Sequence, residues 1–263
     1  MTLASDPRVA DALAACRHLA VHTHHDTVTS TNDLARAAVA AGGAGGLVVS
    51  ADRQSAGRGR RGRSWTDDVA GPDGPANLAV SIALDTPARN AALVPLAAGL
   101  AVAAAYRAAG AAPALKWPND VLLDDRKAAG ILVERHHLDA RDVVVIGCGL
   151  DLDWRGVERA GDAAAWTSVA ESLGRGVDRG AVLAALLGAL DREWDGLADA
   201  ASLLSRYREV CSTIGREVVV SLPGGGELRG PAVDLDTEGL LVVATGEGHR
   251  SVRAGDVTVR PIG

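Results

Sequence analysis

Residues 115–152, LKWPNDVLLDDRKAAGILVERHHLDARDVVVIGCGLDL, carry the pattern that decides the fold class. Apolar segments alternate there with a proline-containing turn and short polar turns, which predicts a strand, a turn, a hairpin and a further strand. The last segment, residues 142–152, is apolar through its first half and ends in glycines, which indicates a buried strand. Consecutive strands of this kind favour a mixed α+β sheet over regular βαβ alternation.

The flanking segments extend this pattern in both directions. Further strands are predicted within residues 18–30 and at residues 47–51 and 77–84, and helices at residues 32–46, from about residue 88 onward, and at residues 182–210. From residue 212 the chain consists of short β segments cut by glycine-rich turns. We therefore expect a mixed-sheet domain flanked by helices over residues 1–211 and a small β-barrel domain over residues 212–263.

Length and composition agree with a folded globular chain. The 263 residues are 48% hydrophobic and 23% charged, so enough apolar side chains are present for a core. The most apolar window, residues 91–106, is interrupted by Pro95 and Gly99 and is shorter than the roughly 20 residues that a membrane span needs. It predicts a buried helix, and no membrane partner.

Charge and cysteine content argue against several classes of protein. A net charge of -6 argues against a protein that coats nucleic acid, because such binding grows with the number of basic contacts. Cys16, Cys148 and Cys211 are odd in number and far apart, which predicts reduced thiols instead of a disulfide framework or a zinc knuckle. The N-terminus shows no basic region followed by an apolar run, so a cytoplasmic location is expected.

One basic segment stands out against this acidic balance, and we call residues 57–65, GRGRRGRSW, the arginine loop. Gly57, Gly59 and Gly62 satisfy the dinucleotide pattern G-x-G-x-x-G, but the residues that follow break helices, whereas the fingerprint needs a helix there. A solvated surface loop, a nucleic-acid patch and a loop that wraps a small anion remain. The glycines favour the last, because they let the backbone approach a ligand closely.

Three other segments offer candidate side chains. KWPND, residues 116–120, places a cation, an indole, an amide and a carboxylate on a turn. Lys127 precedes a strand in which Gly130 allows something to pack against the backbone. In STND, Ser30 or Thr31 is expected to cap the following helix. Each has a plain structural alternative: an ordinary turn, a surface lysine and a helix cap.

The segment HTHHD also raises the question of a metal. His22 and His24 would share one face of a strand, which zinc could use, with His25 and Asp26 close by. No further cluster with ligand spacing accompanies them, so the pattern alone makes a weak case.

Taken in order, TSTND, the arginine loop, NLAVSI, LKWPNDV, RKAAGILVE and IGCGLDL resemble the biotin protein ligases. The resemblance runs from about residue 27 to residue 260. It implies the fold of the biotin and lipoate ligases with an SH3-like C-terminal domain, and the class without a DNA-binding domain. Lipoate ligases share the catalytic fold but do not carry the arginine loop.

The resemblance implies an activity: ATP and biotin form biotinyl-5'-adenylate, and the biotin passes to a lysine of a biotin carboxyl carrier domain of acetyl-CoA carboxylase or a related acyl-CoA carboxylase. Magnesium is expected with ATP, near Asn119 and Asp120. Two anions that react with each other need cations arranged around the developing charge. An enzyme nucleophile is not required, and no Ser/His/Asp or Cys/His set is present in the sequence.

Roles follow residue by residue from the same resemblance. Those implied for biotin are Ser30, Thr31, Asn32 and Gln54 at the ureido ring, Gly57, Arg58, Gly59 and Arg60 over the ligand, Gly130 beneath it, and Lys127 at the carboxylate. Those implied for ATP are Arg60, Arg63, Trp65, Lys116, Asn119 and Asp151. Lys127, Arg63, Lys116 and Asp120 are the expected catalytic groups.

One position departs from the pattern of these ligases. Asp151 stands where many of them have an asparagine after G-x-G, and an ionised carboxylate cannot donate a hydrogen bond to a nucleotide. We also expect the arginine loop to become ordered when an anion binds, because its like charges repel one another until then. The oligomeric state stays open, with a homodimer as one possibility, and no nucleic-acid partner is expected.

Overall fold

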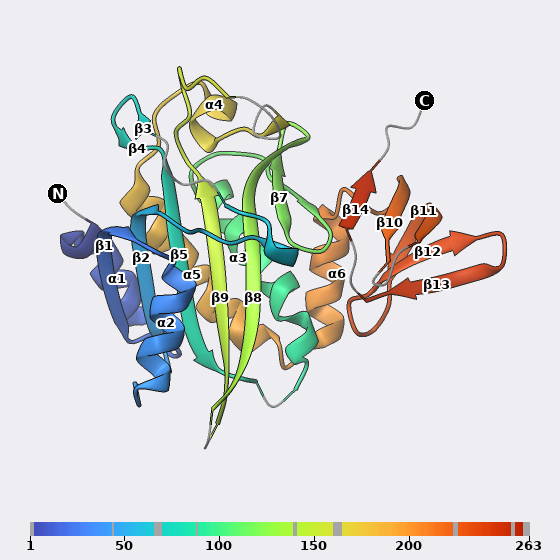
Figure 1. The fold of residues 1–263 in the computed structure, drawn as a ribbon, viewed down its shortest axis with the longest axis horizontal. Helices are drawn as coiled ribbons and strands as arrows, with labels where there is room; N and C mark the ends of the chain where they lie inside the picture. The colour runs from blue at the N-terminus through green and yellow to red at the C-terminus, as the bar shows by residue number, and fades with distance from the viewer. Residues whose placement is uncertain are drawn as a thin grey trace.

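The computed structural model describes residues 3–43, 45–65, 70–87, 89–138, 141–159, 165–222, 226–253 and 256–259. It contains a large sheet covered by helices and, beyond helix α6, a smaller set of strands that ends the chain (Figure 1). This arrangement confirms the predicted α+β class.

The large sheet has seven strands in the order β1-β2-β5-β9-β8-β7-β6. β1 and β2 run parallel, and every other neighbouring pair is antiparallel. The strands are β1 (Val21–Val28), β2 (Leu47–Gln54), β5 (Asn77–Asp85), β6 (Ala114–Lys116), β7 (Asp120–Leu123), β8 (Arg126–Leu138) and β9 (Arg141–Asp151). Residues 115–152 therefore supply four adjacent strands, as their turn pattern predicted.

Helices cover both faces of this sheet. α2 lies across one face, in front of β2 and β5 in Figure 1, and α3 and α5 lie behind the sheet. Successive side chains of β9 point to opposite faces of the sheet. Val143 and Val145 therefore pack with α2, while Val144 and Ile146 belong to the larger core on the other face. The helices are α1 (Pro7–Ala15), α2 (Thr31–Ala40), α3 (Val94–Ala108), α4 (Val169–Leu173), α5 (Arg179–Gly196) and α6 (Ala200–Val210).

Three predicted helices differ from the structure. α2 ends at Ala40, just before the glycines at residues 42 and 43, and not at residue 46. α3 begins at Val94 instead of near residue 88, because Asn90 adopts a left-handed conformation and Pro95 favours the first turn of a helix. The helix predicted over residues 182–210 is two helices. α5 ends at Gly196, and the Asp199 side chain accepts a hydrogen bond from the Ser202 amide to start α6.

The apolar window forms most of α3. Residues Ala91–Ala108 are long and apolar enough to cross a membrane, and 67% of that stretch is buried inside the protein. The prediction of a buried helix is confirmed.

The C-terminal unit is an antiparallel sheet in the order β13-β12-β11-β10-β14. Its strands are β10 (Glu217–Ser221), β11 (Glu227–Leu235), β12 (Leu241–Thr245), β13 (Gly248–Val252) and β14 (Asp256–Val259). The Trp117 indole donates to the Gly239 carbonyl at 3.0 Å, and Arg208 of α6 pairs with Asp234 at 2.6 Å. These contacts dock the unit against the turn and helix that adjoin the larger sheet. Whether the boundary falls at residue 211 stays a prediction.

Candidate active site

The arginine loop lies over β8 and β9, where glycines leave the strand backbone bare. The Trp65 ring occupies this space: a Cβ atom added at Gly149 would come within 2.3 Å of the ring, and one added at Gly130 within 2.8 Å. Gly130 and Gly149 are partners across the β8–β9 ladder, so the two form one surface. The expectation that something packs against Gly130 is confirmed, and the group that does so is Trp65.

Trp65 belongs to a row of three indoles. Its ring stacks on Trp166 with centroids 5.3 Å apart, and Trp166 stacks on Trp154 at 6.2 Å. The Lys127 ammonium lies 5.3 Å from the Trp65 ring and 5.1 Å from the Trp166 ring, within cation–π range. Sequence reasoning missed Trp166. Trp166 lies beside Lys127 because the amide of the next residue, Thr167, donates to the Lys127 carbonyl at 2.7 Å. No local sequence pattern predicts this contact.

Lys127 and Asp120 form an ion pair at 2.9 Å, each about a quarter exposed. They lie on the neighbouring strands β8 and β7, and Asp120 stands opposite Lys116 on β6. Three of the four expected catalytic groups therefore come from one small set of antiparallel strands. The fourth, Arg63, is exposed on the arginine loop.

The arginine loop folds back on itself. The Trp65 amide donates to the Gly57 carbonyl at 2.9 Å, and the Gly59 amide donates to the Arg63 carbonyl at 2.6 Å. Between these bonds a short 3-10 turn, Arg60–Gly62, reverses the chain with Gly62 at a φ of 73°, a value that suits glycine.

Arginine side chains fix this loop to the sheet and to α2. Arg58 pairs with Asp33 at 2.6 Å and with Glu134 at 3.3 Å. The hydrogen bond from Arg58 holds the pKa of Asp33 below its usual range. Arg60 donates to the Asn119 side-chain oxygen at 2.9 Å, which joins the loop to the KWPND turn.

Beneath the loop lies a buried polar cluster at the start of α2. The Thr31 amide and hydroxyl both donate to the Gln54 side-chain oxygen, at 2.8 and 3.1 Å. The Ser81 hydroxyl donates to the Asn32 side-chain oxygen at 2.5 Å and lies 2.7 Å from the Thr31 hydroxyl oxygen. Ser81 was missed, although a serine inside the apolar strand NLAVSIAL was a signal for it.

Ser30 occupies the N-cap position of α2 but makes no capping hydrogen bond with its side chain, so the predicted cap is absent. The Asn32 amide group instead donates to Glu134 at 2.7 Å. Gly147 on β9 is what leaves room for Asn32, because an added Cβ would lie 2.2 Å from its oxygen. Ser30, Thr31 and Asn32 are all buried, at 5% exposure or less.

Asp151 lies deeper than the other predicted site residues. It is fully buried at the end of β9. Tyr106 lies nearby, and its own burial, together with the charge of Asp151, raises the pKa of Tyr106 well above the usual value. A role in nucleotide binding stays a prediction for Asp151, as it does for Lys116 and Arg63.

Comparison with known proteins places the chain in a family. Residues 25–151 match the biotin/lipoate A/B protein ligase family, and residues 213–260 match the biotin protein ligase C-terminal domain. The chain is 37% identical to a biotin--[acetyl-CoA-carboxylase] ligase of Mycobacterium tuberculosis over 87% of its own length and 84% of the relative's. It is 28% identical to the bifunctional ligase/repressor BirA of Bacillus subtilis, over 89% of this chain and 72% of that one.

Solved structures agree on the fold. The biotin protein ligase of Aquifex aeolicus, in complex with biotin and ATP, superposes with a TM-score of 0.74 at 24% identity and covers 91% of this chain and 98% of its own. The Leishmania major enzyme in complex with biotinyl-5-AMP gives 0.59 at 24% identity, over 92% of this chain and 98% of its own. By family match, sequence identity and fold, the chain belongs to the biotin protein ligases of the biotin/lipoate A/B protein ligase family.

Proposed function

We propose that this protein activates biotin with ATP to biotinyl-5'-adenylate and then transfers the biotin to a lysine of a biotin carboxyl carrier domain. The observation that carries the proposal is the position of Lys127. Its ammonium lies between two indole rings and a carboxylate, at the edge of a glycine-lined surface that the arginine loop covers. Relatives named as acetyl-CoA-carboxylase ligases supply the acceptor class.

In the first step, a biotin carboxylate oxygen attacks the α-phosphorus of ATP, and pyrophosphate leaves. Lys127 is the cation for the biotin carboxylate, and its partner Asp120 holds the ammonium in place at 2.9 Å. Arg60 and Arg63 of the loop and Lys116 are the groups for the phosphates. Positive charge fixed beforehand at the reacting oxygens lowers the barrier without reorganisation during the reaction.

In the second step, the acceptor lysine amine attacks the adenylate carbonyl, a proton is lost from the amine, and AMP leaves. Trp65 and the arginine loop lie over the glycine surface and would shield the mixed anhydride from water until the acceptor arrives. The buried polar cluster of Thr31, Asn32 and Gln54 presents hydrogen-bonding groups suited to the ureido ring.

Magnesium would enter with ATP. Asn119 and Asp120 offer the oxygen ligands that this ion prefers; Asn119 accepts a hydrogen bond from Arg60, and Asp120 stands opposite Lys116. The ion would neutralise phosphate charge and favour the departure of pyrophosphate.

The test is a biotin-dependent ATP–pyrophosphate exchange assay followed by transfer to a purified carrier domain. We expect exchange with biotin, no exchange with lipoate, and a labelled carrier. Lys127→Ala should lose exchange while it stays folded, and Arg250→Ala, an exposed change in the C-terminal unit, should retain it. Absence of both exchange and labelling in the wild-type protein would refute the proposal.

A further inference from the structure

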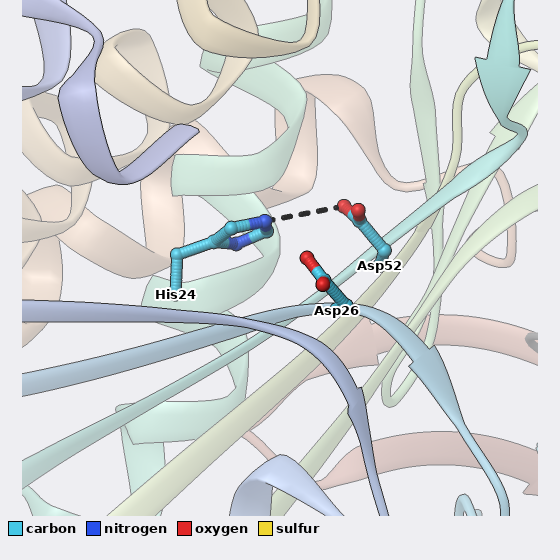
Figure 2. A group of neighbouring side chains, drawn as sticks. All are labelled: His24, Asp26 and Asp52. Atoms are coloured by element: carbon cyan, nitrogen blue, oxygen red, sulfur yellow. Dashed lines mark ion pairs between the residues drawn. The ribbon is translucent and has the colours of Figure 1, made fainter. Parts of the chain in front are cut away.

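Strands β1 and β2 bring a histidine and two aspartates together at the edge of the large sheet. Their parallel register pairs His24 with Ser50, His25 with Ala51 and Thr27 with Arg53, which sets Asp26 level with Asp52. One ligand atom from each of His24, Asp26 and Asp52 lies within 4.8 Å of the others. Figure 2 shows the imidazole and both carboxylates turned toward one another.

The His24 ring is held in one orientation. Its side chain is only 5% exposed, and Nδ1 forms a hydrogen bond with the Ser50 hydroxyl at 2.9 Å. This leaves Nε2 directed at Asp52, 3.4 Å from Oδ1. A hydrogen bond to the ring nitrogen that does not face the ion is how proteins fix the tautomer and the orientation of a metal-binding histidine.

The spacing matches a particular ion. Zinc binds nitrogen and oxygen at about 2.0–2.1 Å in a tetrahedral arrangement, which puts two ligand atoms about 3.3 Å apart. The His24 to Asp52 separation is 3.4 Å. Asp26 is exposed, so its carboxylate can move the remaining distance and leave a fourth position for water.

The charge balance also suits a cation. Arg179 of α5 donates to Asp52 Oδ1 at 2.6 Å, and a carboxylate oxygen has a second lone pair with which the same atom can bind an ion. Two carboxylates beside one guanidinium keep a net negative charge at the cluster. His22, the other histidine on this face, contacts the Ser50 hydroxyl at 2.8 Å, so the hydroxyl that holds the His24 ring is itself held in place.

The geometry points to a binding site for Zn²⁺, or a similar late first-row divalent ion, formed by His24, Asp26 and Asp52. The site uses none of the residues assigned to biotin or ATP. It would join the edge strand β1 to β2 and, through Arg179, to α5. An imidazole ligand excludes Mg²⁺ and Ca²⁺ as the preferred ions, since both take oxygen ligands.

The sequence pattern pointed here only in part. HTHHD suggested that His22 and His24 would share a zinc ion, whereas the structure pairs His24 with Asp26 of the same strand and with Asp52 of the next. Asp52 could not be found from spacing, because it lies 26 residues further along the chain than Asp26.

The test is calorimetric titration of the untagged full chain with ZnCl₂ at neutral pH. We expect one saturable site whose affinity falls at least about tenfold in His24→Ala and in Asp26→Asn, since even outer-shell changes cost that much. Saturating Zn²⁺ should raise the melting temperature of the wild type and raise that of Asp26→Asn by a smaller amount. Because Asp26 is exposed, this variant keeps its fold and decides the result if His24→Ala does not.

Two histidines serve as matched controls. His25 lies on the opposite face of β1, and His137 pairs with Asp142 at an exposed position, so His25→Ala and His137→Ala should both bind Zn²⁺ as the wild type does. Zinc binding that survives Asp26→Asn, or that is lost in either control, would overturn the assignment. So would no saturable binding, or displacement of Zn²⁺ by an equal concentration of Mg²⁺.

Discussion

Replacing Gly149 with alanine should force the Trp65 indole away from the sheet. The added Cβ would lie 2.3 Å from Cε2, 2.5 Å from Cζ2 and 2.7 Å from Nε1 of that ring. Carbon atoms in contact prefer about 3.5–4.0 Å, so the ring must retreat by at least about 1.2 Å. Gly149 is not assigned to any ligand, so the change acts on the site through Trp65.

The cost can be worked from what the ring contacts. If Trp65 stays and its neighbours repack, overpacking costs about 1–3 kcal/mol of unfolding free energy. If the ring leaves, it forfeits its stack on Trp166, about 0.5–1.5 kcal/mol, and its contact with Lys127, about 0.5–1 kcal/mol, as well as its burial. The smaller of the two costs is repacking around a fixed ring, so we expect Gly149→Ala to lower the free energy of unfolding by about 1–3 kcal/mol.

Urea unfolding followed by circular dichroism measures this loss, and pyrophosphate exchange measures its effect on adenylation. Gly188→Ala is the matched control, because its Cβ would meet only Arg192 at 3.5 Å within α5, and it should stabilise the protein by about 0.4–1 kcal/mol. In a Trp65→Ala background the cost of Gly149→Ala should fall below about 0.5 kcal/mol. An unchanged cost in that background would refute the reasoning.

Four further outcomes are expected. Asp120→Asn should lower the rate of pyrophosphate exchange by about tenfold or more by releasing the Lys127 ammonium, and an unchanged rate would remove Asp120 from the site. Because Arg58 lowers the pKa of Asp33, their ion pair stabilises the fold fully above pH 3.8 and is lost as the pH falls through the lowered pKa; Asp33→Asn should therefore show a shallower loss of stability in acid. Burial raises the pKa of Cys148 to about 12, so this thiol should resist Ellman's reagent at pH 8 until the chain is unfolded. Biotin and ATP together should protect the arginine loop from trypsin, and equal cleavage with and without them would contradict the expected ordering.

The local pattern of the sequence determined most of the fold. Alternating apolar residues and turn signals located each strand in residues 115–152, since the backbone geometry of turns and strands restricts which residues fit. The ends of the helices were predicted less accurately. The break between α5 and α6 depends on a cap at Asp199, and the apolar spacing continues across it.

The motifs likewise named segments that the structure brings together, since Arg60 of the arginine loop contacts Asn119 of KWPND, and Lys127 pairs with Asp120. The residues that hold these side chains in place were not predicted. Glu134 holds both Arg58 and Asn32, and no pattern in its own segment marks it for that role.

What the sequence determined by itself is thus the α+β class, the strands of residues 115–152 and the family. Only the tertiary structure decided that Trp65 rests on Gly130 and Gly149, that Trp166 joins it, and that Asp52 meets His24 and Asp26. The physical reason is that these contacts join residues far apart in the chain. They depend on strand order and register, which the packing of the whole sheet fixes and no local segment encodes.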